Sequence, residues 1–469
     1  MQGKNQFVDE KRLKRSVLVV TAFAAFLTPF LGSAVNLALP AIDKDFNTTA
    51  IELGWIPGSF ILSSAMFLLP FGRLADIVGR KKIFTYGISL FTLSTFLIIF
   101  SWNIESLIIF RILQGISGAM IFGTSLAILT SVFGPGERGR AMGINITAVY
   151  TGLSSGPVVG GLLTHYFGWR SIFVFLVPLG IASLYLIFKK MKPEWAEAKG
   201  EKFDWQGSLI YGVSMAFFMY GFSKLPSTQG WFLLGSALVF AILFLLFEKR
   251  IKNPVFDISL ILRNRVFAFS GIAALIHYSA TAATGFFISL YLQYIKGFDA
   301  QTAGFIMISQ PVMMALLSPL AGKLSDKYNP GVIASCGMGL TATGLIMLCF
   351  INEMNPIYLI IIMLVTMGIG FALFSSPNSN AIMSSVEKKY LGVASGVVGT
   401  MRMVGQMLSM GIAMMLLALY MGQDAIVPET YPGLIKGMKT GFLIFSVLCI
   451  LGIFASLARN RKLNNKAVN

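Results

Sequence analysis

Long apolar blocks separated by short polar segments make up nearly the whole chain. Each block is about 17 to 30 residues long, which is the length an α-helix needs to cross the hydrocarbon core of a bilayer. Fourteen such blocks are present, at residues 16–38, 52–71, 83–101, 106–131, 141–163, 171–188, 206–223, 230–247, 266–292, 302–321, 332–351, 356–376, 391–420 and 436–457. The pattern predicts an all-α integral membrane protein with fourteen transmembrane helices.

The composition agrees with this interpretation and excludes several classes of protein. Of the 469 residues, 55% are hydrophobic and 12% are charged, and the mean hydropathy is +0.75. Soluble domains carry about 25% charged residues. Fourteen helices leave no length for a catalytic domain outside the bilayer. The loops offer no nucleophile–base pair, metal-ligand cluster or phosphate-binding glycine loop, so we expect no enzyme activity, no cofactor and no metal.

The formal net charge of +17 follows from the side of the membrane on which the basic residues lie. An even number of helices places both termini on one side. Of the 37 Lys and Arg residues, 29 flank helices on that side and six lie on the other. The positive-inside rule makes the side with the termini cytoplasmic. We therefore predict a multi-pass protein of the cytoplasmic membrane, with a cytoplasmic N-terminus at 1–15 and a basic cytoplasmic tail at 459–469. These charges contact lipid headgroups, and no nucleic-acid partner is expected.

Two short motifs occur twice at nearly the same spacing. The motif GRLAD at Gly72 returns as GKLSD at Gly322, 250 residues later, and RAMG at Arg140 returns as VASG at Val393, 253 residues later. This offset predicts a duplicated protein with an insertion. Its parts are an N-terminal six-helix half at 16–190, two inserted helices at 191–250 and a C-terminal six-helix half at 251–458. Duplicated halves around a central site are typical of transporters that expose that site to each side of the membrane in turn.

The motif at Gly72 continues into a basic cluster and carries the most specific signal in the chain. In the segment GRLADIVGRKK, the acid Asp76 precedes the cations Arg80 and Lys81. An aspartate at a helix end can pair with an arginine or with a neighbouring helix N-terminus, and such a bond can form and break between two conformations. The segment resembles the loop signature of the major facilitator superfamily, which implies a conformational latch. The candidate latch residues are Gly72, Asp76, Gly79, Arg80 and Lys81, with Asp326 in the copy. The alternative is an ordinary basic cytoplasmic loop.

Two further segments resemble motifs of the same superfamily. The segment RILQGISGA in block 106–131 is similar to its buried-arginine motif and makes Arg111 and Gln114 candidate cavity residues. The segment GLSSGPVVGG in block 141–163 is similar to its antiporter motif. The candidate residues of that motif are Gly152, Gly156, Pro157, Gly160 and Gly161. Glycines four residues apart permit close helix packing, and proline removes one backbone hydrogen bond. We expect a tightly packed, bending helix; the alternative is small-residue packing unrelated to export.

The resemblance extends over nearly the whole chain. Fourteen helices, the segment VNLALP around Asn36, the segment FDWQG at 203–207 and the segment YLQ at 291–293 resemble the 14-span drug:H+ antiporter family. The resemblance implies export of cationic and amphipathic drugs in exchange for protons, with Asn36 near the site. One position departs from the family's pattern. Five residues before Asn36, where the family usually has an aspartate, this chain has Leu31.

The acidic residues continue this departure. None of the 20 Asp and Glu residues lies in the middle of a predicted helix, although an intramembrane carboxylate is the usual sign of cation binding or proton relay. Arg111, Arg402 and His277 are the charged or titratable groups that remain inside. Arg402 is either a substrate-facing cation or a structural residue, and His277 is either a proton carrier or a packed side chain. Coupling to protons would run through His277 or through a loop-end acid such as Asp76 or Glu105.

Together these observations predict a secondary active transporter. It exports hydrophobic or amphipathic small molecules by alternating access, and protons are the expected driving ion. One alternative is a transporter of an organic anion or an anionic lipid precursor, because the interior charge is positive. A non-transporting membrane sensor is a third hypothesis, which the intact segment at Gly72 disfavours. We expect a monomer whose partners are a small-molecule substrate, the lipid bilayer and protons. His165, predicted in an outer loop, is given no role.

Overall fold

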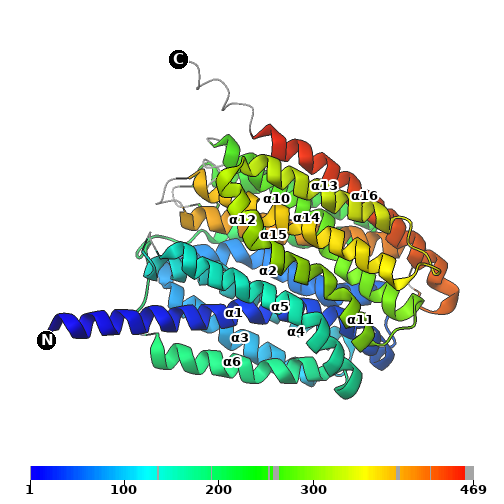
Figure 1. Cartoon of the computed structure of the whole chain (residues 1–469), viewed down its shortest axis with the longest axis horizontal. Coiled ribbons are helices and arrows are strands. Elements are labelled where there is room, and N and C mark those ends of the chain that lie inside the picture. The colour runs from blue at the N-terminus through cyan, green and yellow to red at the C-terminus, as the bar shows by residue number, and fades with distance from the viewer. Residues whose placement is uncertain are drawn as a thin grey trace, which may run out of the picture.

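A computed structural model of the chain describes residues 2–134, 137–191, 193–251, 254–256, 264–386, 391–422 and 424–459. These residues form a bundle of long helices that run side by side (Figure 1). Helix α1 (Gln2–Phe46) begins and helix α16 (Tyr431–Ala458) ends at the same end of the bundle, which we call the terminus side; the other end is the opposite side. Thirteen helical segments are long and apolar enough to cross a membrane, and α7 (Trp205–Lys224) completes the fourteen predicted from the sequence.

The N-terminal half consists of six helices. After α1 come α2 (Ala50–Val78), α3 (Arg80–Ile99), α4 (Ile104–Val132), α5 (Arg138–Phe167) and α6 (Arg170–Lys190). Polar residues between the apolar blocks define where helices restart. The Thr49 hydroxyl accepts a hydrogen bond from the Glu52 backbone N–H at 3.2 Å, and the Glu52 carboxylate accepts one from the Thr49 backbone N–H at 2.7 Å. Such a capping box satisfies two N–H groups that would otherwise lack partners at the start of α2.

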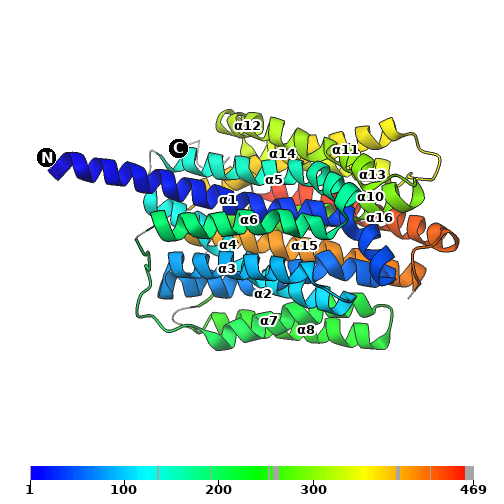
Figure 2. The same ribbon diagram turned by 90° about the horizontal axis from the view of Figure 1, so that it is seen from below.

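The two inserted helices, α7 and α8 (Thr228–Glu248), form a hairpin at the edge of the bundle (Figure 2). Helix α7 packs against α2 of the N-terminal half and α15 (Leu391–Met421) of the C-terminal half. The Tyr211 hydroxyl donates to the Ala65 carbonyl of α2 at 2.9 Å, and the Ser214 hydroxyl donates to the Ala237 carbonyl of α8 at 2.9 Å. Because neighbouring helices satisfy these hydroxyls, α7 can be less apolar than the other transmembrane helices.

The C-terminal half repeats the six-helix pattern with one interruption. Its elements are α10 (Arg265–Leu290), the π-helical turn η1 (Tyr291–Ile295), α11 (Ala300–Met307), α12 (Ser309–Lys327), α13 (Pro330–Leu348), α14 (Ile357–Ser384), α15, the short 3-10 turn η3 (Pro428–Thr430) and α16. The block 302–321, expected as one helix, is divided at Ile308. Pro311 has no backbone N–H to donate to the Met307 carbonyl, and this missing bond accounts for the division.

Arg459, the first residue of the predicted tail, is buried at the end of α16. Its guanidinium donates to the Ser270 hydroxyl at 2.8 Å, the Asn378 side-chain oxygen at 3.0 Å and the Pro330 carbonyl at 3.0 Å. These bonds hold the end of α16 against α10, α14 and α13, so Arg459 is part of the C-terminal half. The rest of the predicted tail, residues 460–469, lies outside the described residues.

Three glycines of the predicted antiporter motif, Gly152, Gly156 and Gly160, face α1. A Cβ at Gly152 would lie 2.5 Å from the carbonyl oxygen of Phe26, and one at Gly160 would lie 2.6 Å from the Cβ of Ala34. Neither position has room for a side chain. The backbones of α1 and α5 therefore touch along more than two turns, as expected for glycines spaced four residues apart.

The remaining motif residues, Gly161 and Pro157, face the other half. A Cβ at Gly161 would collide with the Ala300 carbonyl at the start of α11, and a Cβ at Gly304 of α11 would collide with the Pro157 carbonyl. Helix α5 thus uses one face of the motif within its own half and another face across the boundary between halves. Substitutions on the two faces act on different contacts.

Replacing Gly156 with leucine should block the expected transport activity while the chain still inserts into the membrane. A Cβ at this position would meet the Ser33 hydroxyl and would lie 2.8 Å from the Phe30 carbonyl oxygen. Overpacking of this kind costs about 1–3 kcal/mol, so we expect a lower melting temperature of the purified protein and no substrate movement in proteoliposomes. Gly143→Leu on the same helix is the matched control, because no atom lies within 4 Å of a Cβ there. Equal behaviour of the two variants would show that close packing at Gly156 is dispensable.

Candidate functional site

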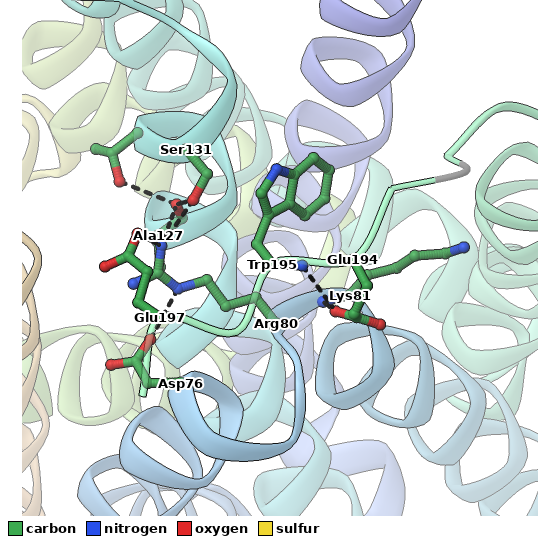
Figure 3. Close-up of polar contacts among 9 residues, drawn as sticks. Asp76, Arg80, Lys81, Ala127, Ser131, Glu194, Trp195 and Glu197 are labelled. Atoms are coloured by element: carbon green, nitrogen blue, oxygen red, sulfur yellow. Dashed lines mark hydrogen bonds and ion pairs between the residues drawn. The ribbon is translucent and has the colours of Figure 1, made fainter. Parts of the chain in front are cut away.

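The turn between α2 and α3 brings the central latch residues together on the terminus side. Gly79 separates the two helices with a φ of +129°, a conformation that favours glycine. Across this turn, the Arg80 Nε donates to the Asp76 Oδ1 at 2.8 Å. The Arg80 Nη1 donates to the Ser131 hydroxyl of α4 at 2.7 Å. One arginine therefore joins three helices of the N-terminal half, as Figure 3 shows.

The segment that links α6 to α7, which we call the strap, supplies the latch with further acids. The Glu197 Oε1 accepts from the Arg80 Nη1 at 2.7 Å, and the Glu194 Oε1 accepts from the Lys81 backbone N–H at 2.8 Å (Figure 3). Arg80 is only 5% exposed, and anionic partners offset the cost of removing its charge from water. It has two, one from its own turn and one from the strap.

Backbone bonds reinforce the contact between strap and latch. The Arg80 N–H donates to the Trp195 carbonyl at 2.8 Å, and the Ala198 N–H donates to the Asp76 carbonyl at 2.9 Å. The strap therefore lies along the latch and connects it to the inserted helix pair. The sequence motif did not predict this contact. The available signal was the row of glutamates at positions 194, 197 and 201 within a segment rich in lysine.

The other latch candidates have different surroundings. Gly72 permits a close approach of α2 and α4, because a Cβ at Gly123 would lie 3.4 Å from the Gly72 Cα. Asp326, in the copy of the motif, accepts a 3.3 Å bond from the Asn380 side chain. The copy has Pro330 where the latch has Arg80, so no guanidinium is available at that position. The copy therefore does not reproduce the arginine network of the latch.

Arg111 and Gln114, predicted as cavity residues, are enclosed within the N-terminal half. Arg111 is 1% exposed, and its Nε donates to the Ile56 carbonyl at 3.1 Å while its Nη1 donates to the Gln114 Oε1 at 2.6 Å. The Gln114 Nε2 donates in turn to the Thr95 hydroxyl at 2.7 Å. This network joins α2, α3 and α4 and stabilises the cation without a carboxylate. In the described conformation both residues hold helices together and neither faces a cavity.

His277 lies in a closed aromatic cluster of the C-terminal half. It is 0% exposed, and its ring stacks on Phe374 at 4.0 Å and meets Phe371 at 5.0 Å between centroids. The Nε2 lies 3.4 Å from the Thr341 hydroxyl, and the Nδ1 has no hydrogen-bond partner among the described residues. A ring enclosed in this way has no water path for protons. The geometry favours the packing hypothesis over proton relay.

Asn36 and Arg402 are the predicted site residues that lie where the halves meet. Asn36 of α1 faces α10: its Nδ2 would lie 3.3 Å from a Cβ at Gly285, and its carbonyl accepts a hydrogen bond from the Ser289 hydroxyl. Arg402 of α15 holds its guanidinium carbon 5.5 Å from the ring centroid of Tyr278. The Arg402 Nε is buried and has no hydrogen-bond partner among the described residues.

Two acid contacts join the halves on the opposite side, and sequence reasoning missed both. The Tyr294 hydroxyl of η1 donates to the Asp43 Oδ2 of α1 at 2.5 Å. The His165 Nδ1, near the end of α5, lies 3.4 Å from the Oδ2 of Asp299, and the Oδ1 of the same residue caps α11. The pKa of Asp299 lies below its ordinary value, mainly because the Thr302 backbone N–H and hydroxyl donate hydrogen bonds to the carboxylate, and His165 lowers it further. Asp299 is therefore ionised at neutral pH. His165, given no role from sequence, is a contact between halves.

Toward the terminus side, one glycine of each half has open space beside it. No atom lies within 4 Å of a Cβ at Gly143 of α5 or at Gly396 of α15. On one flank α2 and α15 remain in contact, with a Cβ at Gly399 lying 3.5 Å from the Leu68 side chain. In the described part of the chain, the hydrogen-bond partners of the Asp76–Arg80 pair belong to the N-terminal half or the strap. Among the described residues, the acid contacts between the halves lie on the opposite side, and the open space beside Gly143 and Gly396 lies on the terminus side.

Comparisons with known proteins agree with this geometry. Residues 21–410 and, overlapping them, 270–468 match the family described as Major Facilitator Superfamily. Over 387 residues the chain is 30% identical to the riboflavin transporter RibZ of Clostridioides difficile (strain 630), covering 82% of this chain and 84% of that protein. It is 29% identical to the multidrug resistance protein Stp of Mycobacterium tuberculosis (strain CDC 1551 / Oshkosh), covering 87% and 77%.

A solved structure shows the same fold. The bacterial homolog of the human lysosomal transporter Spinster, in an inward-facing and unoccupied conformation, aligns with a TM-score of 0.69 at 15% identity, covering 96% of this chain and 97% of that one. The two-half architecture and the sequence relatives therefore agree. The chain belongs to the major facilitator superfamily and is a multi-pass membrane transporter, not an enzyme.

Proposed function

We propose that the protein exports amphipathic small molecules by alternating access, with its terminus side cytoplasmic and protons as the driving ion. The asymmetry of the contacts between the halves carries this proposal. Acid pairs and glycine–backbone contacts close the opposite side, whereas open space lies beside Gly143 and Gly396 on the terminus side. A transporter in this state offers its central site to the cytoplasm, where an exporter takes up its substrate. The similarity to a protein named for multidrug resistance supports drug-like compounds as the substrate class.

The proposed cycle exchanges the contacts on one side for contacts on the other. Opening the opposite side breaks the Asp43–Tyr294 and His165–Asp299 contacts, and closing the terminus side moves the start of α15 toward the α2–α3 turn. Asp76 is about one-third exposed there, and a carboxylate near a helix N-terminus is stabilised by the helix dipole. Because Glu197 of the strap also neutralises Arg80, Asp76 can accept such a contact without leaving Arg80 unpaired.

The interior charge limits the substrates. Arg402 is a cation at mid-depth, and the predicted spans contain no central carboxylate to balance it. A second positive charge on a substrate would meet this uncompensated field. Neutral amphiphiles, monocations and anions are therefore favoured over dications. Arg402 also supports the organic-anion transporter as the second candidate function.

Purified protein in liposomes under an imposed pH gradient tests this proposal. Ethidium, a monocation, should be moved against its concentration gradient and faster with the pH gradient than without it. Propidium shares its ring system but is a dication, and we expect its initial rate to be several-fold lower because of Arg402. The fluorescence of both dyes reports the rates. Propidium moved as fast as ethidium would contradict the charge argument, and transport indifferent to the pH gradient would contradict proton coupling.

The same assay decides the role of His277. His277→Phe keeps a ring for the stack on Phe374, so we expect ethidium transport to remain stimulated by the pH gradient. Loss of that stimulation at an unchanged melting temperature would instead make His277 the proton carrier. Retained stimulation leaves the loop-end acids, Asp76 among them, as the groups that exchange protons.

Asp76→Asn should leave the protein folded and slow its transport cycle. The change removes one charge-assisted bond, and because Asp76 is partly exposed the loss is about 1 kcal/mol. That corresponds to a roughly fivefold lower turnover of ethidium, with little change in melting temperature. Asp326→Asn, at the equivalent position of the copy, is the matched control and should retain the wild-type rate. An Asp76→Asn protein as fast as this control would remove Asp76 from the mechanism.

Tyr294→Phe should shift the protein toward the state that is open on the opposite side. The substitution deletes only the hydroxyl that binds Asp43, and a hydrogen bond to a charged group contributes about 1.5–3 kcal/mol. Spin labels at the exposed loop positions Trp102 and Met354, in a background without the native cysteines, report the separation of the halves. We expect a larger population at long distance.

Tyr291→Phe is the control for this experiment. Its hydroxyl donates to the Asn352 carbonyl within the C-terminal half at 2.7 Å, so its loss leaves the contact between halves intact. The distance distribution should match that of the wild type. If both tyrosine variants give the same distribution, the Asp43–Tyr294 contact does not hold the opposite side closed.

A further inference from the structure

A group of polar side chains from both halves meets around Arg402. The Arg402 guanidinium of α15 lies over the Tyr278 ring of α10. From the N-terminal half, Tyr150 of α5 lies beside Ser318 of α12 and Ser375 of α14 and within the electrostatic reach of Arg402. We call these five residues the Arg402 cluster. They come from five helices, and Tyr150 is the member that crosses the boundary between halves.

The cluster lies near the middle of the membrane. Its members are nine to thirteen residues from the terminus-side ends of their helices. At a rise of 1.5 Å per residue this is about 13–20 Å, close to half of a hydrocarbon core about 30 Å thick. Arg402 and Tyr150 are nevertheless partly exposed. The two residues belong to different halves and lie within electrostatic reach of each other.

One hydrogen-bond donor of the cluster lacks a partner in the described part of the chain. The Arg402 Nε is buried without a hydrogen-bond partner among the described residues, and so is the Ser154 hydroxyl one turn from Tyr150. Arginine stays protonated and presents five N–H donors. By contrast, Arg111 donates to the Ile56 carbonyl and to Gln114 within its own half. The guanidinium of Arg111 therefore has hydrogen-bond acceptors from the protein, whereas the Nε of Arg402 has none among the described residues.

No acid of the helices that carry the cluster is placed to neutralise Arg402. The helical segments of α5, α10, α14 and α15 contain no Asp or Glu. Helix α12 contains one, Asp326, which lies more than two turns beyond Ser318 and contacts Asn380. An unneutralised arginine at this depth is costly, so an anionic ligand there would gain binding energy. Aromatic surface is also present, since the Tyr278 and Phe371 rings meet edge to face at 5.7 Å.

We propose that the Arg402 cluster binds the carboxylate of an amphipathic organic anion while Tyr278 and Phe371 contact its apolar body. The carboxylate oxygens accept from the Arg402 guanidinium and from the Tyr150 and Ser318 hydroxyls. This inference rests on the proposed transport function and narrows its substrate class. Tyr150 and Arg402 belong to different halves, so one ligand would contact both halves at once. A ligand shifts the equilibrium between open and closed states only if it binds one state more tightly than the other, and a contact with both halves can provide that difference.

Fluorescein and its methyl ester test the proposal, because the two dyes differ only in the free carboxylate. Fluorescence anisotropy with the purified full-length protein measures the affinity of each. We expect the wild type to bind fluorescein at least about tenfold more tightly than the ester, as a charge-assisted bond predicts. The Arg402→Gln variant should lose this preference, because the substitution weakens the binding of fluorescein and leaves the binding of the ester unchanged. Arg265→Gln is the matched control, since Arg265 is exposed at the start of α10 over Phe269, and it should bind both dyes as the wild type does.

Two further variants keep the test decisive if Arg402→Gln folds poorly. Arg402→Lys retains the charge and should keep part of the preference for fluorescein. Tyr150→Phe should lower the affinity for fluorescein several-fold at an unchanged melting temperature. If the Arg402 variants bind both dyes more weakly to the same extent, Arg402 has a structural role and the inference is overturned. A wild type that binds the dyes equally would also overturn it.

The outcome separates this inference from the proposed function. Fluorescein bound through Arg402 without movement of any dye in proteoliposomes would support the anion site and refute the exporter. If the protein exports ethidium but binds fluorescein no more tightly than the ester, the result would support the exporter and refute the anion site.

Discussion

A charge within the hydrocarbon core has to find its partners inside the protein, because lipid offers none. This constraint explains the contrast among three arginines. Arg111 is enclosed by a carbonyl, an amide oxygen and the face of Phe60, 4.7 Å from its guanidinium carbon. Arg459, at a helix end, donates to three helices of the C-terminal half. The Nε of Arg459 and the Nε of Arg402 are both buried without a hydrogen-bond partner among the described residues, but Arg402 alone of the three arginines is partly exposed. The ligand proposed above would bind there.

The contacts between the halves divide into two kinds with different consequences. Glycine contacts, such as Gly161 against the Ala300 carbonyl, involve backbone on both sides and allow only one close arrangement. Acid contacts, such as Asp43 with Tyr294, join side chains that can separate and become solvated. Both kinds gather on the opposite side in this conformation. A moving boundary needs the second kind, because a bond to water can replace each one when the halves part.

The inserted helix pair is more than an addition at the edge of the bundle. Its hairpin packs on α2 and α15, which belong to different halves. The strap that leads into it neutralises Arg80 through Glu197 and binds the α2–α3 turn through backbone bonds. The position of the latch is therefore coupled to the inserted helices by covalent connection and by charge.

The sequence by itself determined the order of the transmembrane spans and the two-half architecture, because the length of an apolar block and the repetition of a motif can be read along the chain; the role of the latch residues stays a prediction. It also predicted the close packing of Gly152, Gly156 and Gly160 from their spacing. Only the tertiary structure decided that Arg111 is satisfied within its half, that His277 is enclosed by aromatic rings and that His165 and Asp43 join the halves. Each of these depends on which side chain from a distant helix fills the space around a polar group, and periodicity along one helix carries no information about that partner.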